Sequence, residues 1–154
     1  SPWNKTSNNS FYNPFVFYKP RRGTLHPYPV NSIRGGIVAI TNEYAGSDGD
    51  IFSHSFKQLN LGKLIGTRTW GGVVGINPLR KLIDGTVVTQ PEYAFWFSNV
   101  GYGVENYGVD PDIEIEYSPD DYRNERDPQL DLAIDILLKE NAKNIKKFPD
   151  ELTG

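Results

Sequence analysis

The hydrophobic and polar positions of this chain change their period several times, and each period predicts a different element. Residues 36–41 form a short apolar run rich in β-branched side chains, which is typical of a strand buried on both faces. Residues 48–59 repeat their apolar side chains with the period of a helix, and a second strand is predicted over 64–69. Strand, helix and strand in this order indicate a βαβ unit with parallel strands. The buried arc of the helix is expected to contain Ile51, Phe52, Ser55, Phe56 and Leu59.

The second half of the chain alternates short strands with turns before a final helix. Asp84-Gly85 is the sequence that a type I′ turn prefers, so it predicts a β-hairpin that returns along 86–89. Further strands are predicted over 93–97 and over 113–117, the latter with alternating exposure. Asp127-Pro128 is expected to cap and begin a C-terminal helix. The buried stripe of this helix is expected to contain Leu130, Ala133, Ile134, Leu137 and Leu138.

These patterns predict one α/β domain, because 154 residues are close to the common size of a single domain. Its catalytic subdomain would be the α/β part over 35–148. Residues 1–34 are aromatic and proline-rich, and they are expected to belong to the same domain or to form a docking arm. Residues 149–154 are expected to be a flexible tail.

Composition excludes several classes of function. A formal net charge of −3, from 16 Lys and Arg against 19 Asp and Glu, argues against binding to nucleic acid or to anionic membranes. No apolar run approaches the roughly 18 residues that span a bilayer. The absence of cysteine excludes disulfides, thiolate catalysis and cysteine zinc sites, and two histidines argue against a histidine-rich metal site. No metal and no cofactor are expected, and the compartment stays open between cytoplasm and periplasm.

Ser47 is the first candidate for chemistry, because it lies where a predicted strand hands over to a predicted helix. Backbone N–H groups at a helix N-terminus can stabilise an oxyanion, and the nearby Gly46 and Gly49 allow close approach. The match to a G-x-S-x-G turn is imperfect, since Ala45 replaces the first glycine. Ser47 and Asp50 also have the spacing of a capping box, which would make the serine purely structural. Spacing alone favours the capping interpretation.

A nucleophilic serine needs a general base, and neither histidine supplies an obvious one. His54 is seven residues after Ser47, and about 10 Å of helix rise would separate them. The apolar arc faces elsewhere, so His54 is interpreted as a solvated helix residue. His26 precedes Pro27 in a segment expected to be extended, with nothing to place it near Ser47.

Two glycine-rich segments and an acidic run leave further alternatives open. Glu105 lies in a glycine-rich loop, and without further information it is interpreted as a solvent-facing acid. Residues 70–75 are either a bulged strand or a strip on which a peptide could pair as an added strand. Acidic side chains between 110 and 116 suggest a metal site at first sight. Alternation places Glu114 and Glu116 on a solvated strand face, which argues against one.

Longer motifs then resemble a known family. The chain is similar to the C-terminal catalytic part of the tricorn proteases, which are serine peptidases related to the tail-specific C-terminal processing proteases. The likeness covers about Arg21 to Leu138. It is carried by five segments: Asn42–Asp50, Gly62–Ile76, Asp84–Thr86, Val104–Asp112 and Asp127–Leu130.

The resemblance implies roles that the residues alone do not. It makes Ser47 the nucleophile, gives the Asp48 amide a place in the oxyanion hole and makes Glu105 a member of a Ser-His-Ser-Glu tetrad. It implies a crotonase- or ClpP-like α/β spiral fold, with substrate peptide beside Gly75, Ile76 and Asn77.

The catalytic histidine, its neighbouring serine and one oxyanion donor have no counterpart here. In the family they precede this region, in a helical subdomain followed by a PDZ-like domain. The chain contains no methionine and begins Ser1-Pro2-Trp3, so it is interpreted as a fragment.

Three functions therefore compete. The leading function is to form part of a serine peptidase that hydrolyses peptides through an acyl-enzyme. Assembly into a homo-oligomer is left open. The second is a non-catalytic peptide-binding module of the same fold. The third, an acyl-CoA enzyme of the crotonase type, is disfavoured because the detailed motifs match the peptidases.

Overall fold

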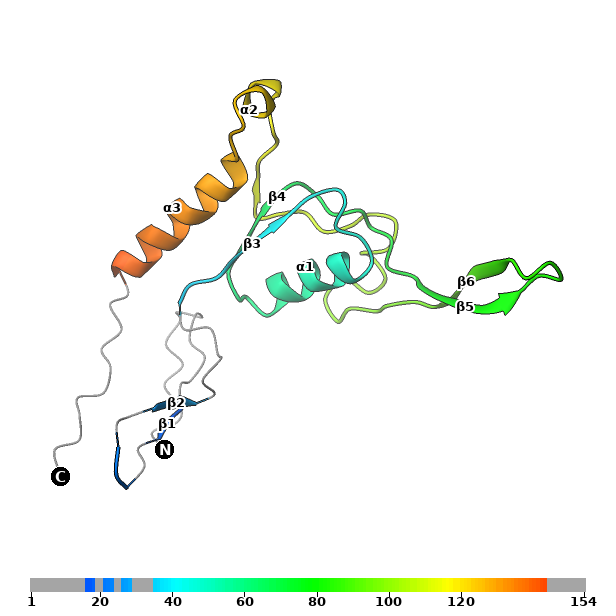
Figure 1. Cartoon of the computed structure of the whole chain (residues 1–154), viewed down its shortest axis with the longest axis horizontal. Coiled ribbons are helices and arrows are strands. Elements are labelled where there is room, and N and C mark those ends of the chain that lie inside the picture. Colours follow the sequence, from blue (N-terminus) through cyan, green and yellow to red (C-terminus); the bar gives the residue numbers. More distant parts are fainter. Residues whose placement is uncertain (1–15, 19–20, 24–25, 29–34, 144–154) are drawn as a thin grey trace.

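The computed structural model describes residues 16–18, 21–23, 26–28 and 35–143, and it places a small α/β body beside a projecting hairpin (Figure 1). Strand β3 (Val38–Thr41), helix α1 (Asp48–Gln58) and strand β4 (Lys63–Gly66) follow one another in the body. β3 and β4 pair in parallel, with Val38 opposite Lys63 and Thr41 opposite Gly66. The predicted βαβ unit is therefore confirmed.

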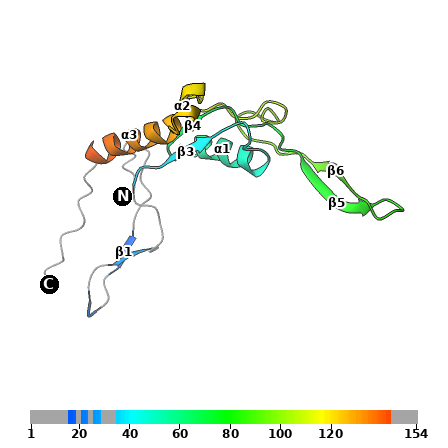
Figure 2. The ribbon, with the colours of Figure 1, turned by 45° about the horizontal axis from the view of Figure 1, so that its top comes forward.

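β4 is the central strand of the sheet. β7 (Ile113–Glu114) pairs in parallel with its other edge, which gives the order β3-β4-β7. Leu64 and Ile65 are fully buried, although consecutive strand residues point to opposite faces, so both faces of β4 are covered. Leu64 packs in one cluster with Phe56 of α1, and α3 (Pro128–Lys143) packs against β3 and β4. Figure 2 shows α1 and α3 lying along these strands.

The prediction that residues 36–41 are buried on both faces is wrong. Val38 and Ala39 are only partly buried, and Ile40 is 45% exposed. β3 has β4 on one side alone in the sheet that the structure describes, so it lacks the second neighbour that a fully buried parallel strand has. The strand expected over 113–117 is shorter than predicted, but its alternation of exposure continues to Tyr117 as expected.

The expected buried arc of α1 is also largely wrong. Phe56 is buried as predicted, but Phe52 and Leu59 are exposed. The other buried residues of the helix are polar: Asp50, Ser53 and His54. The helix is covered on that side by segments from far along the sequence, because Asp50 binds Gly71 and His54 contacts Phe97 and Asn99.

The predicted hairpin is confirmed, but its turn type is wrong. β5 (Gly75–Lys81) and β6 (Val87–Tyr93) pair antiparallel and project from the body (Figures 1 and 2). The Gly85 N–H donates to the Leu82 carbonyl, so Ile83 and Asp84 are the central turn residues, and only Gly85 has a positive φ. This is a longer loop closed by a left-handed glycine, in place of a two-residue type I′ turn. The strand expected over 93–97 is reduced to the end of β6 and an isolated bridge between Phe97 and Gly101.

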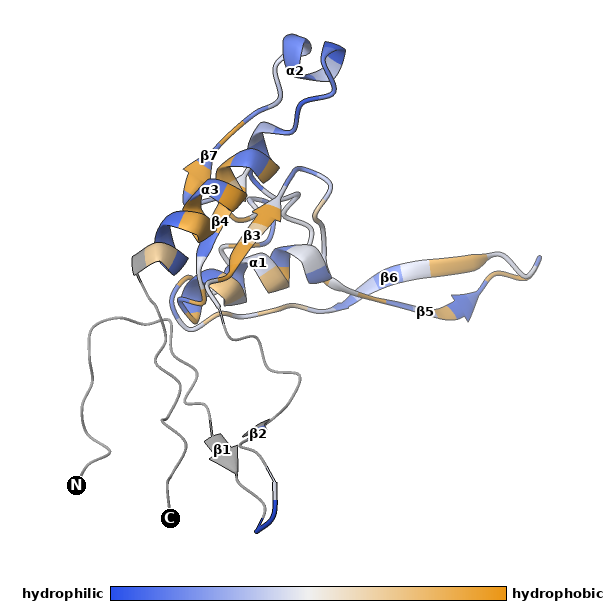
Figure 3. Cartoon of the chain, turned by 60° about the vertical axis from the view of Figure 1, so that its left-hand side comes forward, coloured by the Kyte–Doolittle hydropathy of each residue, from blue (hydrophilic) through white to orange (hydrophobic). Residues whose placement is uncertain are grey.

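The C-terminal helix begins as predicted. The Leu130 N–H donates to Asp127 Oδ1 at 2.9 Å, so Asp127 caps α3 and Pro128 is its first residue. The expected buried stripe is wrong in three of its positions, since Leu130, Ile134 and Leu138 are exposed. Ala133 is buried as predicted, and the other buried residue of the helix is the polar Gln129. Hydrophobic residues gather on β3, β7 and α3 (Figure 3).

Three short elements complete the described residues. α2 (Pro119–Arg123), which the sequence did not predict, precedes α3. β1 (Val16–Tyr18) and β2 (His26–Tyr28) pair antiparallel within the N-terminal segment 1–34. Most of that segment and the predicted tail 149–154 lie outside the described residues. No helix in the described part of the chain combines the length and apolar character needed to cross a bilayer.

We expect the contact between Tyr117 and the start of α3 to survive over a wide pH range. The Tyr117 hydroxyl donates to Asp127 Oδ1 at 2.5 Å. This bond raises the pKa of Tyr117 to about 12 and lowers the pKa of Asp127 below its usual value of 3.8. A raised tyrosine pKa stabilises the fold fully below about 10, and the benefit is lost as pH rises toward about 12. A lowered aspartate pKa stabilises it above about 4, and the benefit is lost at lower pH.

Ultraviolet titration of tyrosine ionisation measures this contact. Asp127→Asn should return one late-titrating tyrosine toward pH 10, and Tyr117→Phe should remove it from the curve. A late titration that is unchanged in Asp127→Asn would contradict the assignment.

Candidate active site

Ser47 lies on a strained turn between β3 and α1. Its φ of 54° and ψ of −110° lie outside the regions that non-glycine residues normally occupy, which costs on the order of 1–3 kcal/mol. The Ser47 N–H donates to the Gly72 carbonyl at 3.1 Å. Its side chain makes no capping hydrogen bond, so the capping-box interpretation of Ser47 and Asp50 is wrong. Ser47 is an exposed residue, and its hydroxyl has no hydrogen-bond partner among the described residues.

Asp48 follows as the first residue of α1. Its N–H makes no hydrogen bond to any described backbone group, while the next amide, from Gly49, donates to the Gly46 carbonyl. An unoccupied N–H at a helix N-terminus lies on the positive end of the helix dipole. An uncommitted hydroxyl and an uncommitted amide on consecutive residues are the groups that nucleophilic attack and oxyanion binding require.

Trp70 borders this turn and was not singled out as a site residue by the sequence. Its side chain is 68% exposed, and a Cβ added at Gly46 or Gly72 would meet its ring carbons within 2.6 Å. The indole therefore lies against Gly46, which precedes Ser47, and against Gly72, whose carbonyl accepts the Ser47 N–H. The signal in the sequence was the pair Gly71-Gly72 directly after this tryptophan, since a side chain at position 72 would overlap the ring.

The segment 70–74 connects the Ser47 turn to the Glu105 loop. The Gly71 N–H donates to Asp50, and the N–H groups of Val73 and Val74 both donate to Glu105. These three amides are occupied, so they are closed to a peptide that would pair along this stretch. The alternative that residues 70–75 form an open pairing strip is therefore wrong for residues 71, 73 and 74.

Glu105 is anchored in the body and does not face solvent. Its Oε2 accepts from the Val73 and Val74 N–H groups at 2.8 Å each, and the residue is partly buried. The solvent-facing interpretation of this side chain is wrong. Oε1 has no hydrogen-bond partner among the described residues. Glu105 does not touch Ser47, but its partner Val73 adjoins Gly72, whose carbonyl accepts the Ser47 N–H.

We expect Gly71→Ala to destabilise the protein strongly, because two loops meet at this glycine. Gly71 has a φ of 86°, and an added Cβ would lie 2.5 Å from the Gly108 nitrogen. Left-handed strain and backbone overlap together should lower the free energy of unfolding by about 2–5 kcal/mol. Chemical denaturation measures the change.

Gly85→Ala is the matched control for this substitution. Its φ is 83°, but nothing lies within 4 Å of an added Cβ. It should cost only the backbone strain, about 1–2 kcal/mol. Equal losses in the two variants would show that the Gly71 contact is unimportant.

The other predicted site residues lie where the segment becomes a strand. Gly75, Ile76 and Asn77 begin β5 and pair with β6, which leaves the other edge of β5 unpaired in the described sheet. Gly75 is buried against the Tyr93 ring, whereas Ile76 is exposed. The Asn77 side chain donates to Glu92. The structure thus brings Ser47, Asp48 and Glu105 around one segment, and 75–77 continue from it.

The prediction that His54 is a solvated residue is wrong. Its side chain is buried, with the residue 8% exposed, and its Nε2 lies 2.9 Å from Asn99 Oδ1. The ring centroid is 4.3 Å from that of Phe97. His26 lies in β2, opposite Tyr18. Neither histidine hydrogen-bonds to Ser47 in the part of the chain that the structure describes.

The acidic run has partners other than a metal. Asp110 accepts hydrogen bonds from Tyr107 at 2.8 Å and Arg68 at 2.6 Å, which hold its pKa below the usual value. Asp112 accepts from the Leu64 N–H and pairs with Lys57. Among the described residues, no three histidine or carboxylate side chains are grouped so as to hold a metal ion.

Known proteins share this sequence and this arrangement. The chain is 76% identical to a tricorn protease from Thermoplasma acidophilum over 121 residues, which are 79% of this chain and 11% of that protein. It is 59% identical to a putative tricorn-like protease C-terminal subunit from Sulfurisphaera tokodaii, over 78% of this chain and 14% of that one. The crystal structure of the tricorn protease superimposes with a TM-score of 0.78 at 70% identity, covering 85% of this chain and 13% of that chain.

These matches confirm the α/β fold class and the resemblance inferred from the motifs, while the spiral detail of the fold stays a prediction. The chain spans roughly a tenth of the length of the tricorn proteases that it matches. Residues 4–115 match the sequence profile of peptidase family S41, and the chain therefore belongs to that family.

Proposed function

We propose that this chain provides the nucleophile and part of the charge-stabilising groups of a serine peptidase. Ser47 Oγ would attack the scissile carbonyl carbon while a base takes its proton, and the Asp48 N–H would bind the resulting oxyanion. Collapse of that intermediate releases the amine and leaves an acyl-enzyme on Ser47, which water then hydrolyses. The observation that carries this proposal is the strained Ser47 turn with an uncommitted hydroxyl beside an uncommitted helix N-terminal amide.

The general base is proposed to come from another part of a longer parent protein. Among the described residues neither histidine hydrogen-bonds to Ser47, and His54 Nε2 lies 2.9 Å from Asn99 Oδ1. The family resemblance implies a histidine and a serine in a preceding helical subdomain, followed by a PDZ-like domain. Glu105 Oε1 is open to receive a partner from such a part.

Exposed apolar side chains support the presence of covering segments in the parent. Phe52 and Leu59 lie on the apolar arc that the sequence predicts for α1, yet both are exposed in the described structure. Trp70, beside the proposed nucleophile, is exposed as well. Large apolar side chains left exposed beside a proposed active site are consistent with faces that other segments or subunits cover.

An assay of the isolated 154-residue chain against its longer parent tests the proposal. The parent should cleave an internally quenched peptide, whereas the chain alone should be almost inactive. Loss of a general base removes about 10²- to 10⁴-fold, and loss of an oxyanion donor removes about another 10²- to 10³-fold. Equal turnover by both proteins would show that His26 or His54 is the base.

The alternative is a peptide-binding module without turnover, which is favoured by the lack of a hydrogen bond between Ser47 and either histidine among the described residues. It predicts that the parent binds peptide without cleaving it and does not react with a fluorophosphonate. Cleavage by the parent would exclude this alternative.

A further inference from the structure

We propose that Asp50 is a positioning residue for the nucleophile. It accepts a hydrogen bond from Gly71 and does not form a capping box with Ser47 at the start of its own helix. This inference rests on the proposed function of Ser47. Two stretches of this chain have the same Ser-x-x-Asp spacing at the start of a helix, Ser47 to Asp50 and Ser118 to Asp121. The structure uses them in opposite ways.

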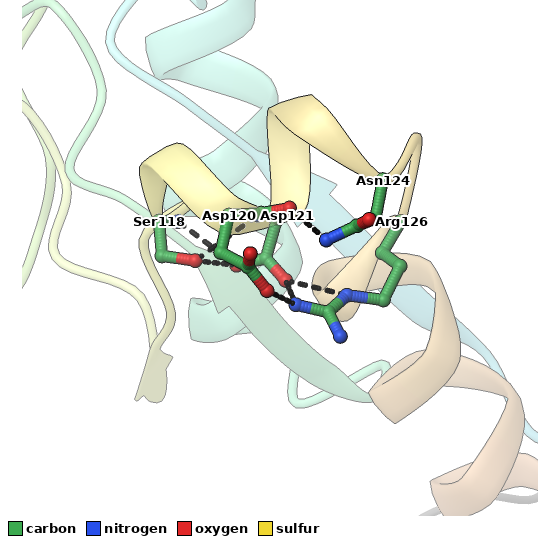
Figure 4. Close-up of polar contacts among 5 residues, drawn as sticks. All are labelled: Ser118, Asp120, Asp121, Asn124 and Arg126. Atoms are coloured by element: carbon green, nitrogen blue, oxygen red, sulfur yellow. Dashed lines mark hydrogen bonds and ion pairs between the residues drawn. The ribbon is translucent and has the colours of Figure 1, made fainter.

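The second stretch forms a complete capping box at the start of α2. The Asp121 N–H donates to Ser118 Oγ at 3.2 Å, and the Ser118 N–H donates to Asp121 Oδ2 at 2.9 Å. Ser118 has ordinary extended angles, φ −77° and ψ 158°. Its hydroxyl also donates to Asp121, so it is fully committed to the cap (Figure 4). A serine in this arrangement has no free hydroxyl for chemistry.

The first stretch makes neither of those two reciprocal bonds. The Ser47 N–H donates to the Gly72 carbonyl, and Asp50 Oδ1 accepts the Gly71 N–H at 2.8 Å. Ser47 and Asp50 thus bond to backbone groups of the 70–74 segment and not to each other. The Ser47 hydroxyl is left without a capping bond, and its φ of 54° turns it away from the capping geometry.

The burial of Asp50 argues against a role in stability alone. The residue is 0% exposed, and its Oδ2 has no hydrogen-bond partner among the described residues. A buried carboxylate oxygen without a partner is destabilising, although the N-terminal dipole of α1 offsets part of the cost. Such a group persists where the surrounding structure and the function require it.

Asp50 and Glu105 hold adjacent parts of one segment. Asp50 fixes Gly71 from α1, while Glu105 fixes Val73 and Val74 from its loop. Gly72 lies between these anchors and accepts the Ser47 N–H. Release of Gly71 would therefore let Gly72 and Ser47 shift together. A misplacement of about 1 Å at a reacting group can cost about 10²-fold in rate.

The test compares Asp50→Ala, Asp50→Asn and Asp121→Ala in the full-length parent. Asp50→Ala should lower kcat about 10²-fold with KM within about threefold, because substrate contacts remain while the nucleophile moves. Asp50→Asn keeps an oxygen for the Gly71 N–H and should stay within about fivefold of the unsubstituted kcat. Asp121→Ala removes the same side chain from the same motif at α2 and should leave kcat unchanged.

Hydrogen exchange gives a readout that is independent of activity. Peptides that span 70–74 should exchange about tenfold faster in Asp50→Ala and unchanged in Asp121→Ala. If Asp50→Ala does not fold, Asp50→Ser takes its place, since its hydroxyl is too short to hold Gly71 but can bond within the helix.

Two results would overturn the inference. One is an unchanged kcat in Asp50→Ala, and the other is a loss of kcat in Asp50→Asn as large as in Asp50→Ala. The second would mean that the charge matters and the Gly71 bond does not. Failure of the proposed function would appear differently, as an absence of peptide cleavage in the unsubstituted parent.

Discussion

Substitution of Ser47 by alanine in the longer parent should abolish peptide hydrolysis. We expect kcat to fall on the order of 10⁴- to 10⁶-fold, because no other described group can form the acyl-enzyme at this turn. Labelling by a fluorophosphonate should be lost in parallel. The fold should change little, since the Ser47 hydroxyl makes no hydrogen bond among the described residues and its N–H bond to Gly72 is retained.

Thermal unfolding provides the structural control for this variant. Ser47→Ala should melt close to the unsubstituted protein, whereas a serine that capped α1 would cost about 1 kcal/mol on removal. Full peptidase activity in Ser47→Ala would show that Ser47 is not the nucleophile.

Substitution of Glu105 by glutamine should lower kcat about 10²- to 10⁴-fold with little change in KM. The glutamine carbonyl can still accept the Val73 and Val74 N–H groups that Oε2 now accepts. The negative charge and the open Oε1 are lost, so groups that this carboxylate orients would lose their partner. Steady-state kinetics of the parent measure the effect.

Glu105→Ala separates the structural contribution of this side chain from the electrostatic one. It leaves the Val73 and Val74 amides without their acceptor, so it should lower the melting temperature, which Glu105→Gln should not. If Glu105→Gln keeps full kcat and only Glu105→Ala is impaired, Glu105 is a backbone anchor and has no part in catalysis.

The elements that depend on local sequence were predictable. The single elements of the βαβ unit and of the hairpin follow from short local patterns, as does the Asp127 cap, and the structure contains all three. The failures involve partners that are distant in sequence. His54 looks solvated on a helical wheel, but Phe97 and Asn99 cover it. The spacing of Ser47 and Asp50 suggests a capping box, but in the structure Asp50 bonds to Gly71 and the Ser47 N–H bonds to Gly72.

The candidate site was predicted in part for the same reason. Ser47 could be singled out by its place between a strand and a helix, although the motif resemblance was needed to prefer chemistry over capping. Glu105 had no local signal, because its two partners lie about thirty residues earlier, in a segment whose path the sequence did not reveal. Asp50 was seen only as a capping partner for Ser47.

Peptide mapping of the parent after reaction with a fluorophosphonate identifies the nucleophile directly. We predict a single adduct on Ser47, with parallel loss of peptide cleavage. The adduct should be absent from the isolated 154-residue chain, which lacks a base near this hydroxyl. An adduct on a different serine, or cleavage that continues when Ser47 is fully modified, would contradict it.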